Sequence, residues 1–322
     1  MKAKRILTLL LSSVLLLGSI ALFSSCGSKY EYTIGISQLV QHEALDAATE
    51  GFKKAVEDKF GAGKVKFIEL NASGNSDTLI TNAQQLVSKK VDLIMANATG
   101  ALTSAASATT TIPILGTSIT DYSTALEIGA DNWTGKTGRN ISGTSDLAPL
   151  DKQADLVKDF FPDAKTVGIL YCSSEPNSYF QYKVIEPMLK DRGYTVKAFT
   201  FSDSNDVNAI AEKACDESDV IYIPTDNTAA SCIETIKNVL TNKQTPMIAG
   251  EAGICKAGIA TLSISYYDLG YQTGLMAYEV LVNGKNIAEM EIKYLDTYKK
   301  LFNEEMGALF EITMPEGYEK LS

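Results

Sequence analysis

The stretch VDLIMA, residues Val91–Ala96, decides the fold class. A short and almost continuously apolar run of this kind is typical of a strand that is covered on both faces, as in a parallel sheet flanked by helices. Before it, Asp77–Ser88 carries apolar residues at helical spacing, and after it Ala101–Ala108 is a run of small residues that suits a helix. A strand between two helices predicts a βαβ unit and a parallel sheet.

The same alternation extends outward along most of the chain. Further strands are expected at Tyr32–Ser37, Val65–Leu70, Pro113–Gly116, Thr166–Tyr171, Thr195–Phe201, Val220–Ile223, Pro246–Ala249 and Ile259–Ile264. Further helices are expected at Ala44–Phe60, Pro149–Phe161, Ser178–Arg192, Val207–Cys215, Thr228–Leu240 and Leu269–Val282. These strands and helices form two consecutive sets, which together contain too many residues for one typical core. We therefore predict an α/β protein with two doubly wound parallel-sheet lobes.

One segment interrupts the alternation. Asp131–Asp146 is rich in Gly, Asn, Ser and Thr and has no clear period, so the chain is expected to cross between the lobes there.

The first residues have the parts of an export signal. Lys2, Lys4 and Arg5 precede an apolar run that ends at Phe23, and Ser24, Ser25 and Cys26 follow. The pattern resembles a bacterial lipoprotein signal, with Phe23 where Leu is usual, and it predicts removal of residues 1–25, lipidation of Cys26 and a place on the extracytoplasmic face of the cell membrane. An ordinary cleaved signal and an uncleaved membrane anchor stay open as alternatives, because the run is near the length that spans a bilayer.

Without residues 1–25 the chain has 26 basic and 39 acidic residues, a net charge of −13. This balance argues against nucleic acid as a partner, because phosphate binding needs clustered Lys and Arg. Besides Cys26, four cysteines remain, Cys172, Cys215, Cys232 and Cys255, and none of them forms a CxxC pair that would indicate a metal site. Disulfides and buried free thiols both stay open for them.

Short polar residues follow most of the expected strands, where open α/β sheets bind their ligands. The candidate ligand-binding residues are Ser37, Gln38, Thr99, Thr117, Ser118, Asn177, Ser178, Thr225, Asp226, Asn227, Glu251 and Asp268. Any one of them also suits a helix N-cap without function, since Asp, Asn, Ser and Thr are favoured there. As a set they favour a small polar ligand held by many neutral hydrogen bonds and a few charges.

Catalytic patterns are scarce. The single histidine, His42, lies at an expected helix start, where a capping or surface role is favoured over catalysis, and the sequence has no GxSxG, Walker, GxGxxG or HExxH motif. We therefore expect a protein that is not an enzyme and that uses no cofactor and no metal.

Several segments resemble the type I periplasmic-binding-protein lipoproteins of ABC uptake systems, in the branch that includes tryptophan- and tyrosine-type binding proteins. They are IGISQLVQHEALDAATEGF (Ile34–Phe52), GRNISGTSD (Gly138–Asp146), VGILYCSSEPNS (Val167–Ser178), IYIPTDNTAAS (Ile221–Ser231), DLGYQTG (Asp268–Gly274) and the tail FNEEMGALFEITMPEGYEK. Ser142 and Cys172 depart from the usual residues of this family.

The resemblance implies lobes joined by a three-crossover hinge that close on a ligand. Residues 26–145 plus 266–290 would form lobe 1, and residues 146–265 plus 291–322 would form lobe 2. It implies a monomeric solute-binding lipoprotein that delivers a small solute, above all an amino acid and within that class an aromatic one, to an ABC permease in the membrane. A sugar or nucleoside ligand and a ligand-sensing role coupled to a membrane kinase stay open.

An amino acid would need donors for its carboxylate and an acceptor for its ammonium group. We expect donors at the Asn177–Ser178 and Thr225–Asn227 junctions with Thr99 and Thr117 opposite, and Asp268 as the acceptor, followed by Asp226 and Glu251. The side chains available as a flat wall for an aromatic ligand are Leu39, Tyr122, Tyr179 and Tyr266.

Overall fold

The computed structural model describes residues 30–321. The fold described below is that of the compact unit that starts at Tyr32. The expected lipidation site, Cys26, lies outside the described residues. Within residues 30–321, no helix combines the length and the apolar character needed to cross a membrane.

Six strands form the first sheet, in the order β11-β5-β4-β3-β1-β2, and all neighbours are parallel. Their bounds are β1 Tyr32–Gln38, β2 Val65–Asn71, β3 Leu93–Asn97, β4 Ile114–Ile119, β5 Ile141–Ser145 and β11 Lys293–Tyr294. Strands β3 and β4 are buried along their whole length, which explains the continuous apolar run that predicted this layer.

Seven strands form the second sheet, in the order β13-β12-β10-β9-β8-β6-β7. Their bounds are β6 Thr166–Cys172, β7 Thr195–Phe201, β8 Val220–Ile223, β9 Met247–Ala249, β10 Ala260–Ser263, β12 Lys299–Phe302 and β13 Glu319–Lys320. Strand β12 runs antiparallel to β10, and the other neighbours are parallel.

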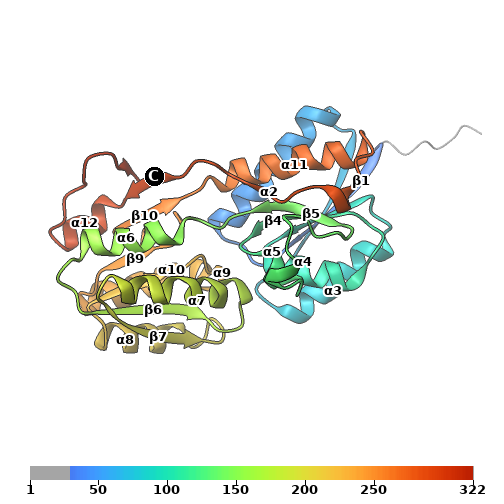
Figure 1. Cartoon of the computed structure of the whole chain (residues 1–322). Helices are drawn as coiled ribbons and strands as arrows, with labels where there is room; N and C mark the ends of the chain where they lie inside the picture. The colour runs from blue at the N-terminus through green and yellow to red at the C-terminus, as the bar shows by residue number, and fades with distance from the viewer. Residues whose placement is uncertain (1–29, 322) are drawn as a thin grey trace, which may run out of the picture. The chain divides into compact units, whose positions relative to one another are not determined.

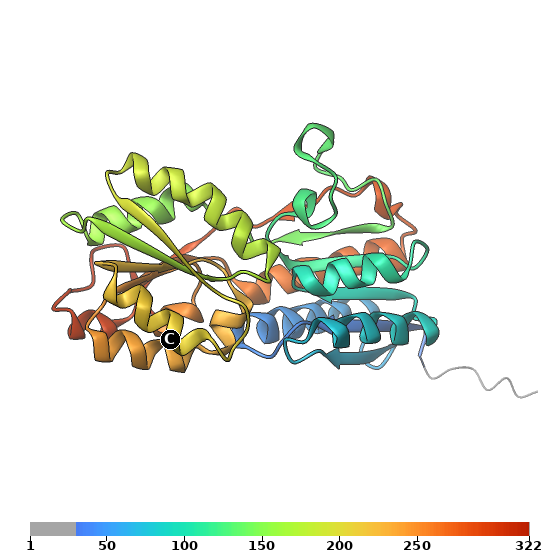
Figure 2. The ribbon, with the colours of Figure 1, turned by 90° about the horizontal axis from the view of Figure 1, so that it is seen from below.

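Helices flank both sheets (Figures 1 and 2). Beside the first sheet lie α2 Glu43–Phe60, α3 Ser76–Ser88, α4 Thr99–Ala108, α5 Tyr122–Ala125 and α11 Tyr266–Leu281. Beside the second lie α6 Leu150–Phe160, α7 Pro176–Asp191, α8 Val207–Asp216, α9 Asn227–Ser231, α10 Ile233–Lys243 and α12 Glu304–Leu309. We call the two halves the first lobe and the second lobe.

Each sheet is buried on both faces. Along β6, Ile169 and Tyr171 belong to one apolar core, while Leu170 and Cys172 belong to another. In the first lobe, α2 and α11 pack side by side (Figure 1). A Cβ atom at Gly270 would lie 1.8 Å from the carbonyl oxygen of Ala48, so only glycine permits this close approach of the two helices.

The chain crosses between the sheets three times. The crossings follow β5 at residues 146–149, β10 at residues 264–265 and β11 at residues 295–298. The α/β fold class with two parallel-dominated sheets and a three-crossover hinge is therefore confirmed.

The crossing expected at Asp131–Asp146 is wrong in its position. That segment contains strand β5, and the crossing begins only at Asp146. The sequence does not predict this strand, because its small polar residues are explained only by the close approach of its backbone to that of Gly116. Gly143 has φ +145°, and a Cβ there would lie 2.0 Å from the carbonyl oxygen of Gly116.

Two smaller differences and one question left open by the sequence concern the second half of the chain. The expected helix Thr228–Leu240 is two helices, α9 and α10, which meet at Cys232. Strand β11 pairs with β5 of the first sheet, whereas residues 291–322 were assigned to lobe 2; the other lobe boundaries stay a prediction. The cysteines named above, from Cys172 to Cys255, are free thiols.

Candidate functional site

The carboxyl ends of three central strands meet at one edge of the first sheet. Gln38 of β1 pairs with Asn97 of β3, and Asn97 pairs with Thr117 of β4. Beside them, three buried hydroxyl oxygens have no hydrogen-bond partner within the described part of the chain: those of Ser37, Thr99 and Ser118. Buried polar atoms are nearly always bonded, so this cluster indicates a place where a ligand supplies the missing partners.

The N-terminus of α4 lies at the same edge. Its N-cap residue, Ala98, has φ +88° and offers no side-chain cap, and Ser118 has φ +57° at a register irregularity of β4. Left-handed backbone is costly for residues other than glycine and persists mainly at functional sites. An uncapped helix start presents free N–H groups and a positive end of the helix dipole, which suit a carboxylate.

The facing wall in the second lobe is built around Glu175. Its Oε2 accepts hydrogen bonds from Asn177 Nδ2 at 3.1 Å, Asn227 N at 3.1 Å and Asn227 Nδ2 at 2.7 Å. Its Oε1 accepts from Thr228 N at 2.8 Å and Thr228 Oγ1 at 2.7 Å. Five donors hold this carboxylate in one orientation at the start of α9, and Glu175 is only 6% exposed.

A second carboxylate, Asp226, is buried behind this wall. It accepts from Cys172 N at 2.6 Å and from Ala229 N at 2.8 Å. Burial, followed by repulsion from Glu175, raises the pKa of Asp226 to about 7.

A hollow of about 160 Å³ separates the two walls. Leu39, Gly74 and Gly100 line it from the first lobe, and Glu175, Asn177 and Thr228 line it from the second. A tight crevice continues past Thr99 and Asn177 to Phe180. The hollow is smaller than the roughly 300–1,000 Å³ of a typical ligand pocket, so a ligand needs the lobes or side chains to move apart.

Two contacts bridge the lobes beside this hollow. His42 Nε2 lies 3.2 Å from Asn227 Oδ1, and Lys256 forms an ion pair with Glu43. At the hinge, the Tyr266 hydroxyl donates to Asp146 Oδ2 at 2.9 Å, and Thr120 Oγ1 donates to Asp146 Oδ1 at 3.0 Å. Burial raises the pKa of Asp146, while its two donors oppose that effect.

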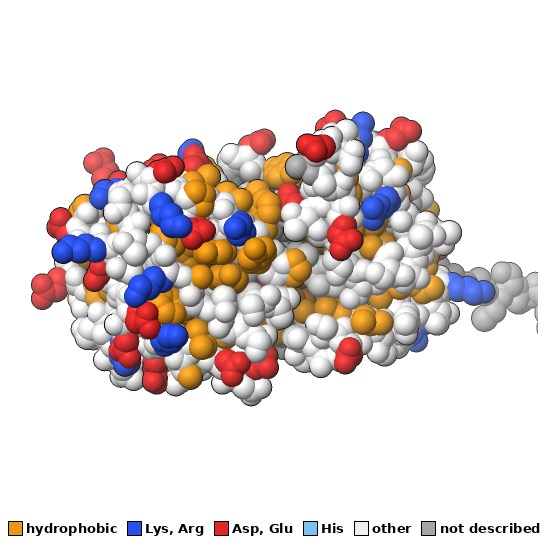
Figure 3. Space-filling view, turned by 60° about the horizontal axis from the view of Figure 1, so that its bottom comes forward, with side chains coloured by type: hydrophobic (Ala, Val, Ile, Leu, Met, Phe, Trp, Pro, Cys, Tyr) orange, Lys and Arg blue, Asp and Glu red, His pale blue; other side chains and the backbone are white. Residues whose placement is uncertain are grey.

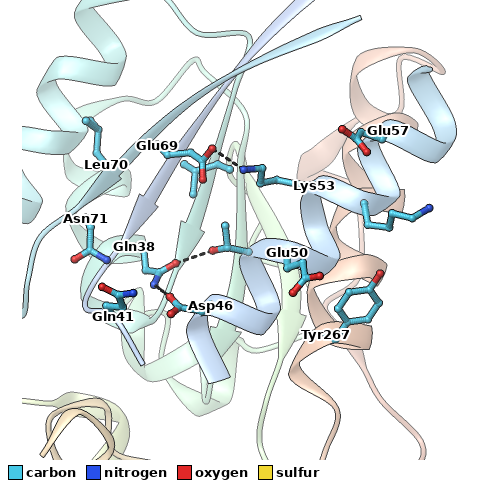
Figure 4. A pocket seen from close by; sticks show the side chains of 13 residues that line it. Gln38, Gln41, Asp46, Glu50, Lys53, Glu57, Glu69, Leu70, Asn71 and Tyr267 are labelled. Carbon is cyan, nitrogen blue, oxygen red and sulfur yellow. Dashed lines mark hydrogen bonds and ion pairs between the residues drawn. The ribbon is translucent and has the colours of Figure 1, made fainter. Parts of the chain in front are cut away.

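A larger hollow of about 650 Å³ lies on the first lobe, beside α2 and β2 (Figure 4). Several of its polar side chains are paired: Gln38 Nε2 donates to Asp46 Oδ1 at 2.7 Å, Thr49 Oγ1 donates to Gln38 Oε1 at 2.7 Å, and Lys53 pairs with Glu69 at 2.6 Å. The three unpartnered buried hydroxyls named above do not line this hollow, so the candidate ligand site is the one between the lobes despite the smaller volume there.

Comparison with known proteins agrees with this architecture. The family model described as ABC transporter substrate binding protein matches residues 33–321. This chain belongs to that family. Such substrate-binding proteins work outside the cytoplasm.

Three relatives refine the picture. A tyrosine-binding protein of Clostridioides difficile (strain R20291) is 35% identical, over 94% of this chain and 91% of its own. The structure of a Streptococcus pneumonia ABC domain in complex with L-Trp is 30% identical, covers 90% of this chain and 99% of its own, and has a TM-score of 0.85. A ligand-free, open substrate-binding protein with adhesive properties from Clostridium difficile is 34% identical over the same shares, with a TM-score of 0.68. The arrangement of this binding protein is thus nearer to the L-Trp complex than to the open structure, despite the slightly lower identity.

Several candidate residues of the binding protein come together at the two walls. Ser37, Thr99 and Ser118 lie at the first, and Asn177 and Asn227 at the second. Ser178 is fully buried, and its hydroxyl bonds to Asn177 Nδ2 at 3.3 Å.

Other candidates have their bonding capacity taken up elsewhere. Thr117 Oγ1 accepts from Thr144, and the backbone carbonyl of Thr225 accepts from Asn177 and Gln181. Glu251 accepts the N–H groups of Gly253 and Ile254, and burial raises its pKa to about 7.

Asp268 does not fit its expected role. It is exposed in the first turn of α11, where its own N–H is capped by Ser265, so it lacks the shielding that strengthens an ammonium pair. Two donors expected at the Thr225–Asn227 junction are likewise already bonded within the protein, Thr225 N to the amide oxygen of Gln181 and Asn227 N to the carboxylate of Glu175.

The four residues expected as a flat wall for an aromatic ligand lie in different parts of the structure. Leu39 lines the hollow, whereas Tyr122 is buried with its hydroxyl bonded to the carbonyl of Thr144, and Tyr179 is 52% exposed. Tyr266 belongs to the hinge.

Three functional candidates were missed. Glu175 is part of the polar segment after β6 but was not singled out, and no sequence signal distinguishes it from a surface glutamate. Asp146 was treated as the end of a linker. His42 occupies the N-cap position of α2 but makes no capping bond with its side chain, which turns to Asn227 instead.

Proposed function

We propose that this protein captures an aromatic amino acid, L-tyrosine or L-tryptophan, between its lobes and delivers it to an ABC permease. The observation that carries the proposal is the pairing of an uncapped, uncharged donor edge in the first lobe with a buried carboxylate in the second. The names of the two most informative relatives support the same ligand class.

The ligand carboxylate would bind the start of α4. The free N–H groups of this helix, together with the hydroxyls of Thr99 and Ser118, supply donors without a competing positive side chain. The described residues that line the hollow between the lobes include neither Lys nor Arg.

The ligand ammonium group would bind Glu175. Asn177 Nδ2, its most replaceable donor, also lies within reach of Thr225 O at 3.2 Å and Ser178 Oγ at 3.3 Å. It can therefore release Glu175 and keep two partners, so the ammonium group gains a charge-assisted bond without leaving a buried amide unpaired.

The lipid anchor at Cys26 and the absence of catalysis belong to the same proposal. Acidic and basic side chains are interspersed on the face shown in Figure 3, which supports a carrier of small solutes over a nucleic-acid-binding surface.

Labelling with a radioactive fatty acid in cells tests the lipid anchor at Cys26, with Cys26→Ser as the control.

A thermal-shift panel of amino acids, sugars and nucleosides tests the ligand class. A ligand at 100 times its Kd stabilises the native state by about 2.7 kcal/mol, which raises Tm by roughly 5–10 °C. We expect such a shift with L-tyrosine or L-tryptophan. Stabilisation by sugars or nucleosides and by no amino acid would overturn the proposal.

A further inference from the structure

The only histidine of the chain joins the two lobes. His42 precedes α2 in the first lobe, and its Nε2 lies 3.2 Å from Oδ1 of Asn227, at the start of α9 in the second lobe. The two residues are 185 positions apart in the sequence and belong to different lobes. The bond between them therefore exists only when the lobes are together.

Asn227 connects the histidine to the proposed ligand wall. Its backbone N–H and its Nδ2 both donate to Glu175 Oε2, at 3.1 Å and 2.7 Å. This orientation leaves Oδ1 pointing away as an acceptor, and the donor that meets it is the Nε2–H of His42. The imidazole, the amide and the carboxylate thus form one chain of hydrogen bonds from the first lobe to Glu175.

We propose that His42 is a positioning residue for ligand capture, which couples lobe closure to the orientation of Glu175 through Asn227. This inference rests on the proposed function, because it assumes that Glu175 faces the ligand. His42 does not touch the ligand itself and acts through Asn227.

The surroundings of His42 determine the sign of the pH effect. Glu43 and Asp46 face it from α2, and Glu175 faces it from the second lobe, while Lys256 is paired with Glu43. Burial between the lobes outweighs the attraction of these carboxylates and lowers the pKa of His42. In separated lobes the imidazole is free of that burial and titrates near its ordinary value of about 6.5.

Closure therefore releases a proton from His42 when the pH lies between the lowered pKa of the closed state and that ordinary value. The contribution of His42 to the affinity should be constant above about pH 6.5 and should weaken binding at lower pH, by at most about tenfold per pH unit for one proton. The fall should end where the pH reaches the lowered pKa of the closed state, because His42 is then charged in both states.

Isothermal titration with L-tyrosine and with L-tryptophan from pH 7.5 to pH 5.0 tests this role. The variants are His42→Gln, which keeps a neutral N–H donor, His42→Ala, which has none, and Lys256→Gln, which removes the ion pair with Glu43 between the lobes. We expect His42→Gln to bind at pH 7.5 within about threefold of the wild type and to lose the acid-dependent fall. His42→Ala should bind about 2- to 13-fold more weakly at pH 7.5, the equivalent of one hydrogen bond.

Lys256→Gln is the control for loss of a bridge between the lobes, and it should keep an acid-dependent fall in affinity. An unchanged pH profile in His42→Gln would overturn the role of His42 and leave the proposed function intact. Failure of the wild type to bind either amino acid at pH 7.5 would overturn the proposed function and the role of His42 with it. Thermal unfolding of each variant without ligand separates these outcomes from a loss of fold.

Discussion

Replacement of Thr99 by valine separates ligand binding from stability. The side chain is 3% exposed, and its hydroxyl has no partner in the described part of the chain. Valine has nearly the same shape and a similar helix propensity, so the change removes one oxygen and little else. The protein without ligand should lose no hydrogen bond.

The two expected effects have opposite signs. A buried hydroxyl without a partner costs about 1–3 kcal/mol, so Thr99→Val should leave the free energy of unfolding unchanged or raise it by about 1 kcal/mol. A hydrogen bond to a ligand carboxylate is worth about 1.5–3 kcal/mol, so Kd should rise about 10- to 150-fold.

Thr261 offers a matched control. It lies in β10, is fully buried, has a hydroxyl that is also unpartnered among the described residues, and does not line the hollow between the lobes. Thr261→Val should gain stability like Thr99→Val but keep the wild-type Kd. Urea unfolding without ligand and isothermal titration with L-tyrosine and L-tryptophan measure both quantities. A wild-type Kd in Thr99→Val would refute its place at the ligand carboxylate, and a loss of more than about 1 kcal/mol of stability would refute the claim that its hydroxyl is unpartnered.

Three further changes test other parts of the structure. Glu175→Gln should lower the free energy of unfolding by about 3 kcal/mol, because an amide cannot accept from all five donors. The substitution also removes the repulsion between Glu175 and Asp226, but only at a pH where Asp226 is ionised, so the loss of stability in urea unfolding should be larger at pH 6 than at pH 8. Glu186→Gln, on the outside of α7, is the control. Tyr266→Phe should lower the free energy of unfolding by about 2 kcal/mol, because it removes a donor from the buried Asp146. The Tyr271 hydroxyl meets the exposed Asp58 at 3.2 Å, so the control Tyr271→Phe should lower it by less than about 0.5 kcal/mol. Equal unfolding midpoints of the two variants would contradict the hinge bond. Gly143→Ala should cost at least about 3 kcal/mol, because its Cβ would collide with the backbone of Gly116, whereas Gly138→Ala, with φ +66° and open space around it, should cost about 1 kcal/mol in the same assay.

The sequence predicts most of the fold because each layer has a local signal. Buried parallel strands read as apolar runs, as in β3 and β8, and the helices beside them keep an apolar stripe, as in α2. Strand β5 escapes this reasoning. Its residues Ser142, Gly143 and Thr144 fit a strand only because β4 and Tyr122 approach so closely, and that proximity is a property of the folded chain.

The site was predictable at the level of strand ends and not at the level of individual roles. The rule that ligands bind beyond the carboxyl ends of strands selected Thr99, Ser118 and Asn177, and these residues lie at the hollow between the lobes, at the crevice that continues it or at its first-lobe edge. It did not distinguish Asp268, which is exposed, from Glu175, which is buried, because in the sequence both lie between an expected strand and the expected helix that follows it. Burial and the count of donors decide between them, and both depend on which loops pack together.

The division of charge between the two walls explains how closure could select a zwitterion. The first lobe offers neutral donors at the start of α4, and the second offers the carboxylate of Glu175. A ligand with only an ammonium group would satisfy Glu175 and leave the α4 donors and the Thr99 hydroxyl buried without partners when the lobes close. A ligand with only a carboxylate would bring a second negative charge toward Glu175 and Asp226. Only a ligand with both groups supplies partners for the polar groups that closure buries on both walls. Closure itself therefore discriminates against solutes that carry only an ammonium group or only a carboxylate.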